Sequence, residues 1–166
     1  MTNENKTSIY YYSGTGNSYL VAEYMQKAIE NSKLHNLLTY SGETIKSKVL
    51  VIIFPVHMYG IPPVVLDFID QMNISKEILI YAVCTCGGIQ GETMYHMDEA
   101  IKEKDCQLAG GYVVKMPRNY TVEFKVQSKK EQLKILSAMK ERVASIAEEI
   151  KLNKQTFNIR KFKISK

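Results

Sequence analysis

SIYYYSGTGNSYL, residues 8–20, is the stretch that decides the fold of this chain. Its apolar first half predicts a buried strand, and its second half predicts a tight turn that opens a helix. The free N–H groups of a helix N-terminus and the positive end of its dipole attract an anion. Gly14 and Gly16 allow a positive φ and a close approach of the backbone to a ligand. Neutral donors complete the turn: Ser13, Thr15, Asn17 and Ser18. The turn therefore predicts a site for a phosphate held by neutral groups.

Three other interpretations of this turn compete with that one. A nucleoside-triphosphate loop requires a Lys before its last hydroxyl residue, and Asn17 occupies that place. A dinucleotide fingerprint requires a third Gly where the helix packs on the strand, and Tyr19 stands there. The third alternative is a turn that only caps its helix, and the loops further along the chain make it less favoured.

Length and composition predict one domain in the cytoplasm. The chain has 166 residues, of which 45% are hydrophobic, enough for one well-filled core. Its polar start, MTNENKTS, does not resemble a signal peptide, and the apolar run 49–56 is far shorter than the roughly 20 residues of a membrane span. We therefore expect no membrane insertion. The three cysteines lack CxxC spacing, so we also expect no metal site.

Charge divides the chain into two unequal parts. Residues 151–166 contain six Lys or Arg and no acidic residue, whereas the other 150 residues contain 16 basic and 17 acidic ones. We therefore expect a nearly neutral domain over residues 1–152 and a basic tail over residues 153–166. Because nucleic-acid binding requires basic residues clustered on a folded surface, this distribution argues against it.

Apolar runs alternate with helical stripes along the chain. Continuous apolar runs are typical of parallel strands covered on both faces. The expected strands are 7–12, 35–38, 49–54, 78–84 and 107–116. Because parallel strands require right-handed helical crossovers, the pattern predicts an α/β fold: a doubly wound three-layer sandwich around a five-stranded parallel sheet.

In such a sheet, ligands bind at the carboxyl ends of the strands, where the strand order reverses. The first, third and fourth strands then bring three loops together. The second of these loops supplies Pro55, Val56, His57, Met58, Tyr59 and Gly60. The third loop, nearly stripped of side chains, supplies Thr85, Cys86, Gly87, Gly88, Gln90 and Gly91. One phosphate site and two walls predict a mononucleotide with a flat head group.

The three loops, in this order, resemble those of the flavodoxin family. The similarity covers residues 6–152 and is greatest to the flavodoxin half of proteins that fuse this domain to a bacterial-type ferredoxin. It includes residues after the fifth strand, namely Met116, Pro117, Asn119 and Tyr120. The resemblance implies the strand order 2-1-3-4-5. It also implies FMN as cofactor, with its phosphate on residues 13–18, one flavin face and the N5 edge on residues 55–60, and the pyrimidine edge on residues 85–91. Asn119 and Tyr120 either cover this site or cap a loop.

The chain also departs from that family. It has no Trp, so any stacking on the flavin falls to His57 or Tyr59, and it lacks the acidic charge typical of flavodoxins. The Cys-rich ferredoxin segment is missing, so an iron–sulfur partner would be a separate chain. The basic tail makes an acidic ferredoxin the expected redox partner.

These observations favour an FMN-binding electron carrier that needs no catalytic residue. The alternative is a quinone or porphyrinogen oxidoreductase that takes electrons from NAD(P)H or a reduced carrier, with His57 or Tyr59 as proton donor. A third possibility is a binding or signalling module without flavin. A phosphoacceptor receiver would need acidic residues where the first strand ends in Tyr10, Tyr11 and Tyr12.

Overall fold

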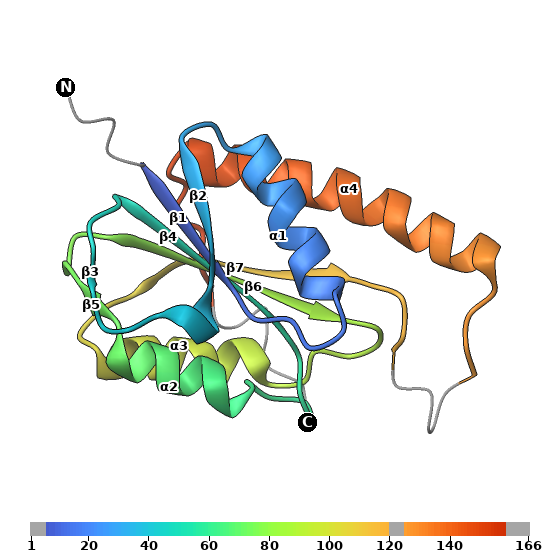
Figure 1. Ribbon diagram of the computed structural model, residues 1–166, viewed down its shortest axis with the longest axis horizontal. Coiled ribbons are helices and arrows are strands. Elements are labelled where there is room, and N and C mark those ends of the chain that lie inside the picture. Colours follow the sequence, from blue (N-terminus) through green and yellow to red (C-terminus); the bar gives the residue numbers. More distant parts are fainter. Residues whose placement is uncertain (1–5, 120–124, 159–166) are drawn as a thin grey trace.

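The computed structural model describes residues 6–119 and 125–158, and its centre is a parallel sheet (Figure 1). The strands are β1 (Thr7–Tyr11), β2 (Ser32–Asn36), β4 (Val49–Pro55), β6 (Leu79–Cys86) and β7 (Leu108–Lys115). They are paired in the order β2-β1-β4-β6-β7, and every pairing is parallel. Counted along the chain, this is the order 2-1-3-4-5, so the predicted fold class is confirmed.

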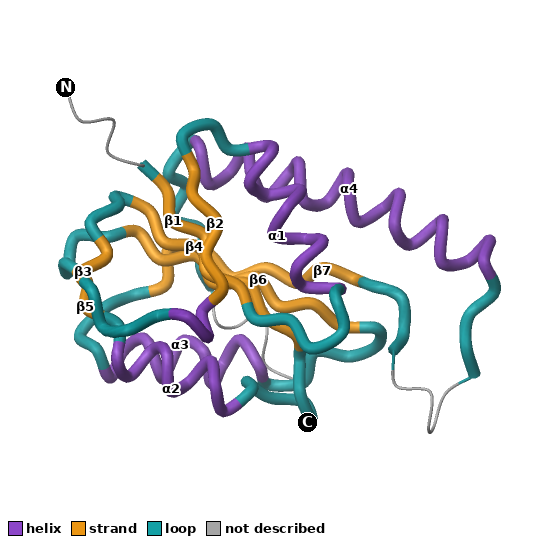
Figure 2. The backbone as a smooth tube through the Cα atoms, viewed as in Figure 1, coloured by secondary structure: helices purple, strands orange, loops and turns teal. Residues whose placement is uncertain are grey.

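Helices cover both faces of the sheet and make three layers (Figures 1 and 2). One face carries α1 (Asn17–Ala28) and α4 (Lys129–Lys151), and the other carries α2 (Pro63–Gln71), α3 (Thr93–Glu103) and the short 3-10 helix η1 (Leu37–Thr39). A second sheet, of β3 (Thr44–Ile45) and β5 (Asn73–Ile74), was not expected from the sequence.

The apolar residues of β4 show why its sequence does not alternate with polar residues. Val51 and Ile53 lie in the core cluster under α1 and α4. Leu50, Ile52 and Phe54 lie in the cluster under α2 and α3. All five side chains have no exposed surface, because helices cover both faces of a doubly wound sheet.

The second strand is the one whose predicted bounds differ most from the structure. We expected it at residues 35–38, but it spans Ser32–Asn36, with Ser32 opposite Thr7. Its residues are only partly buried because β2 is an edge strand, and an edge strand needs no apolar run. The other four strands begin and end within two residues of their expected bounds.

Helix α4 is longer than the sheet that it covers. It begins with a capping box in which Ser128 and Glu131 satisfy each other's backbone N–H groups. Its five buried residues lie between Met139 and Ile150, so the first turns of the helix extend past the end of β7 (Figure 1).

The chain after α4 returns to the edge of β7. Thr156 N and Phe157 N both donate to the Ala109 carbonyl oxygen, at 2.9 and 3.0 Å. The Phe157 ring packs on the core cluster under α2 and α3. These contacts extend the packed part of the chain beyond the expected boundary at residue 152, and residues 159–166 of the expected tail lie outside the described residues.

Over residues 6–119 and 125–158, every helix is too short or too polar to cross a bilayer.

Candidate functional site

The turn after β1 has the form that its sequence predicts. Gly16 N donates to Ser13 Oγ at 3.0 Å, and Gly16, at φ +97°, is the residue from which α1 begins. In the described residues no side chain caps this helix, so its first N–H groups have no partner inside the helix. Gly14, for which we expected a positive φ, does not have one; a Cβ there would meet nothing within 4 Å. The turn therefore offers open backbone donors at a helix N-terminus.

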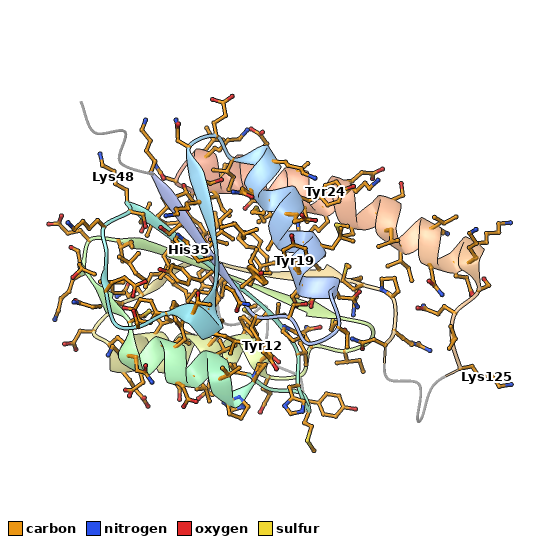
Figure 3. The ribbon with its side chains drawn as sticks, in the orientation of Figure 1. Tyr12, Tyr19, Tyr24, His35, Lys48 and Lys125 are labelled. Atoms are coloured by element: carbon orange, nitrogen blue, oxygen red, sulfur yellow. The ribbon has the colours of Figure 1, made fainter. Side chains whose placement is uncertain are left out.

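Two tyrosines flank the turn and can be followed in Figure 3. Tyr12 comes directly after β1, and its N–H donates to the Ile53 carbonyl oxygen at 2.9 Å. Tyr19 stands in the first turn of α1, where its ring packs on Tyr11 with the centroids 5.2 Å apart. A tyrosine in contact with the strand keeps the helix from the close glycine-mediated packing that a dinucleotide fingerprint requires.

Ser18 points into the domain. Its Oγ lies 2.8 Å from Thr85 Oγ1, and the two residues are only 1% and 2% exposed. This hydrogen bond joins the start of α1 to the end of β6. The hydroxyls of Ser18 and Thr85 are therefore occupied with each other, whereas Thr15 is exposed at the tip of the turn.

The loop after β4 is a tight turn with two strained residues. His57 and Gly60 exchange both backbone hydrogen bonds, at 3.0 and 2.9 Å. Between them, Met58 and Tyr59 have φ of 46° and 62°, which costs about 1–2 kcal/mol for each non-glycine residue. Gly60 has no positive φ, and its two hydrogen bonds to His57 close the turn. Met58 and Tyr59 are 86% and 67% exposed, so this strained turn presents apolar side chains to the surface.

The loop after β6 packs closely on its neighbours. Gly91 has φ +58°, and a Cβ there would lie 2.6 Å from Tyr59 Cβ. A Cβ at Gly87 would lie 3.1 Å from Arg118 Cα. Gly91 needs glycine because the Tyr59 residue passes so close, whereas a side chain at Gly87 would require Arg118 to shift and Gly88 faces open space. The loop therefore holds the second loop on one side and the segment after β7 on the other.

The thiols at this edge have structural contacts. Cys86 Sγ lies 3.5 Å from the Gly88 carbonyl oxygen and 3.5 Å from Lys115 Nζ. Burial raises the pKa of the Cys84 thiol well above its usual range, so Cys84 stays protonated and unreactive. No group of three potential metal ligands occurs in the described part of the chain.

Sequence reasoning left the role of Asn119 open, and the structure shows that the segment after β7 belongs to this edge. Asn17 Nδ2 donates to the Pro117 carbonyl oxygen at 3.0 Å, and Asn119 Nδ2 donates to Thr15 Oγ1. The sequence did contain a signal for this contact, because Pro117 and Asn119 follow the fifth strand at the same edge as the three loops. Tyr120 lies outside the described residues.

All three predicted loops meet at the carboxyl edge of the sheet. Ser18 and Thr85 join the first loop to the third, and the Val56 N–H donates to the Thr85 carbonyl oxygen at 2.9 Å. The fold is flavodoxin-like. Comparison with solved structures supports this assignment: an FMN-dependent NADH-azoreductase from Bacillus anthracis str. Ames Ancestor, in complex with FMN, has a TM-score of 0.59 at 13% identity, over 88% of this chain and 99% of that one.

Two further neighbours have the same fold. A flavodoxin from the domain Archaea matches with a TM-score of 0.55 and 17% identity, over 87% of this chain and 98% of its own. Rubredoxin oxygen:oxidoreductase from Desulfovibrio gigas matches with a TM-score of 0.54 and 16% identity. The match covers 87% of this chain but only 36% of that enzyme. No family model and no curated protein sequence matches the chain. The likeness in all three cases is one of fold.

Proposed function

We propose that this protein binds one FMN and transfers electrons through it. The observation that carries the proposal is the turn after β1, where a helix N-terminus without a side-chain cap meets neutral hydroxyl and amide groups. A phosphate monoester fits this combination because open N–H groups and the helix dipole stabilise its charge without a Lys or Arg. Residues 13–18 would hold that phosphate, with Ser18 contributing its backbone N–H because its hydroxyl is bonded to Thr85.

The two other loops fit a flat ring. The loop of residues 85–91 exposes backbone at Gly88, where a planar group can lie close to the peptides. The loop of residues 55–60 presents His57, Met58 and Tyr59 at the surface. Strained non-glycine residues persist only where surrounding structure holds them, and they concentrate at ligand sites. The azoreductase, which has the same fold, is described as a complex with FMN.

When bound, FMN would supply the one- and two-electron chemistry. The residues of this chain would bind the phosphate, orient the ring and limit the access of water to one of its faces. In the first loop, backbone N–H groups and the Thr15 hydroxyl would carry the binding. The residues that border the ring would be Pro55, Val56, His57, Met58, Tyr59, Gly60, Thr85, Cys86, Gly87, Gly88, Gln90 and Gly91.

We infer that the protein is an electron carrier rather than an enzyme that converts a small substrate. The connections from β4 to α2 and from β6 to α3 are short, so these two loops build no substrate pocket over a ring. The second candidate is a flavin-dependent oxidoreductase of quinone or porphyrinogen type. The NADH-azoreductase of the same fold favours it, and His57 or Tyr59 would then donate a proton.

The proposed partner of the carrier is an acidic redox protein such as a ferredoxin. Residues 125–134, which extend beyond the sheet, contain four exposed Lys and a single Glu. Such a cluster steers an acidic partner toward this end of the molecule within a Debye length of about 8–10 Å. The resemblance to domains fused to ferredoxins supports the same partner.

The absorption spectrum of the unheated protein tests the proposal directly. We expect flavin bands, and we expect heat to release FMN at one molecule per chain. Release of FAD, or no binding after incubation with excess FMN, would contradict the proposal. Reduction by a reduced acidic ferredoxin, compared with NADH-driven turnover of an azo dye or a quinone, distinguishes the carrier from the enzyme.

A further inference from the structure

The segment after β7 crosses the edge of the sheet between the first and third loops. On one side, Asn17 Nδ2 donates to the Pro117 carbonyl oxygen at 3.0 Å. On the other side, Arg118 packs so closely on Gly87 that a Cβ there would lie 3.1 Å from Arg118 Cα. The backbone just before Asn119 is therefore held from both sides, and the fold sets the position of the Asn119 side chain.

Asn119 reaches the exposed tip of the first loop from 104 positions away in the sequence. Its Nδ2 donates to Thr15 Oγ1. A threonine hydroxyl has one hydrogen to donate and two lone pairs that accept. Because the amide N–H occupies one lone pair, the hydrogen of Thr15 must point away from Asn119, and it remains available to another acceptor.

We propose that Asn119 is a positioning residue of the first loop, which directs the Thr15 hydroxyl hydrogen toward a bound phosphate. The inference rests on the proposed function, because it places a phosphate in the turn after β1. A hydroxyl without this neighbour distributes over several staggered rotamers and donates to water. Fixing its direction before the ligand arrives removes part of the ordering cost of binding.

The test is a titration of the full-length chain, freed of flavin, with FMN and with riboflavin. Asn119→Ala should weaken FMN by about 2- to 12-fold, which corresponds to a neutral hydrogen bond of roughly 0.5–1.5 kcal/mol at about 1.4 kcal/mol per decade. Riboflavin, which lacks the phosphate, should bind the variant and the unmodified protein equally. Asn119→Asp should weaken FMN more, because a carboxylate accepts the Thr15 hydrogen and repels the phosphate.

The chain offers a matched control for the asparagine substitution. Asn73 Nδ2 donates to Thr44 Oγ1 at 2.9 Å, which is the same pair of groups in the small sheet of β3 and β5. Asn73→Ala removes an exposed Asn–Thr hydrogen bond away from the three loops, so it should leave FMN affinity unchanged.

A double-mutant cycle separates positioning from direct contact. In a Thr15→Ala background, Asn119→Ala should have no further effect on FMN affinity, since the hydroxyl that it directs is gone. Additive losses, or an equal loss for riboflavin, would overturn the inference, because they mean that Asn119 acts without Thr15. Full FMN affinity in Asn119→Ala would overturn the inference and leave the proposed function intact. Failure of the unmodified chain to bind FMN would overturn both.

Discussion

Replacing Ser18 by Ala should destabilise the protein, because it leaves the buried hydroxyl of Thr85 without its hydrogen-bond partner. Ser18 Oγ and Thr85 Oγ1 lie 2.8 Å apart, and the two residues are 1% and 2% exposed. Removing one hydroxyl leaves the other buried without this partner, which costs about 1–3 kcal/mol. For a domain of this size, each kcal/mol lowers Tm by about 2–4 °C, so Ser18→Ala should lower Tm by about 2–12 °C.

Thermal unfolding of the flavin-free chain, followed by circular dichroism, measures this effect with two comparison variants. Thr15→Ala removes an exposed hydroxyl from the same loop and should change stability by about 0.5 kcal/mol or less. Combining Ser18→Ala with Thr85→Val removes both hydroxyls and leaves no unpaired group. Because replacing both partners is nearly neutral, this double variant should recover most of the lost Tm.

Two results would refute the reasoning. Equal Tm losses for Ser18→Ala and Thr15→Ala would show that burial of the Ser18–Thr85 pair does not decide the cost. A double variant less stable than Ser18→Ala alone would show that the Thr85 hydroxyl has another stabilising role.

Three further predictions concern other parts of the molecule. Gly91→Ala should destabilise the chain by about 1–2 kcal/mol from its φ of +58° alone, and by more because the new Cβ would contact Tyr59. Denaturant unfolding measures this loss of stability, and a variant as stable as the wild type would contradict the close approach. Burial raises the pKa of Tyr10 to about 12, so its contribution to stability is present below pH 10 and lost as the pH rises toward 12. Tyr10→Phe should therefore flatten the fall of Tm over that interval, and parallel pH profiles would exclude this origin. Phe157→Ala should cost roughly 1–3 kcal/mol, because its ring packs on the core beside Gly111; an unchanged Tm would show that the chain after α4 contributes no packing energy.

The buried strands could be predicted because burial on both faces restricts their composition. Only apolar residues fill a strand such as β4, so the sequence alone locates it. The edge strand β2 has no such restriction, since its sequence SKLHN is half-buried and depends on pairing with β1. The return of Phe157 to the edge of β7 depends on the same kind of long-range contact and was not foreseen.

At the candidate site, the sequence indicated which loops meet but not what each side chain does. The parallel order of strands places the three loops at one edge whatever their side chains are. The inward orientation of Ser18 follows from the position of Thr85, a residue 67 positions away. The positive φ of Met58 and Tyr59 was not predicted either, because glycine is the residue type that favours this region and neither residue is one.

The sequence by itself determined the α/β class, the buried strands and the turn that opens α1, because periodicity and turn residues act over a few positions of chain. Only the tertiary structure decided which of these hydroxyls is exposed, which is buried and which partner each one has. Thr15 is exposed, and its hydroxyl accepts a hydrogen bond from the Asn119 amide. Ser18 is buried, and its hydroxyl is hydrogen-bonded to that of Thr85. Hydrogen-bond partners are chosen by proximity in space, and these two partners come from the end of β6 and the segment after β7, which only the folded sheet brings beside the first loop.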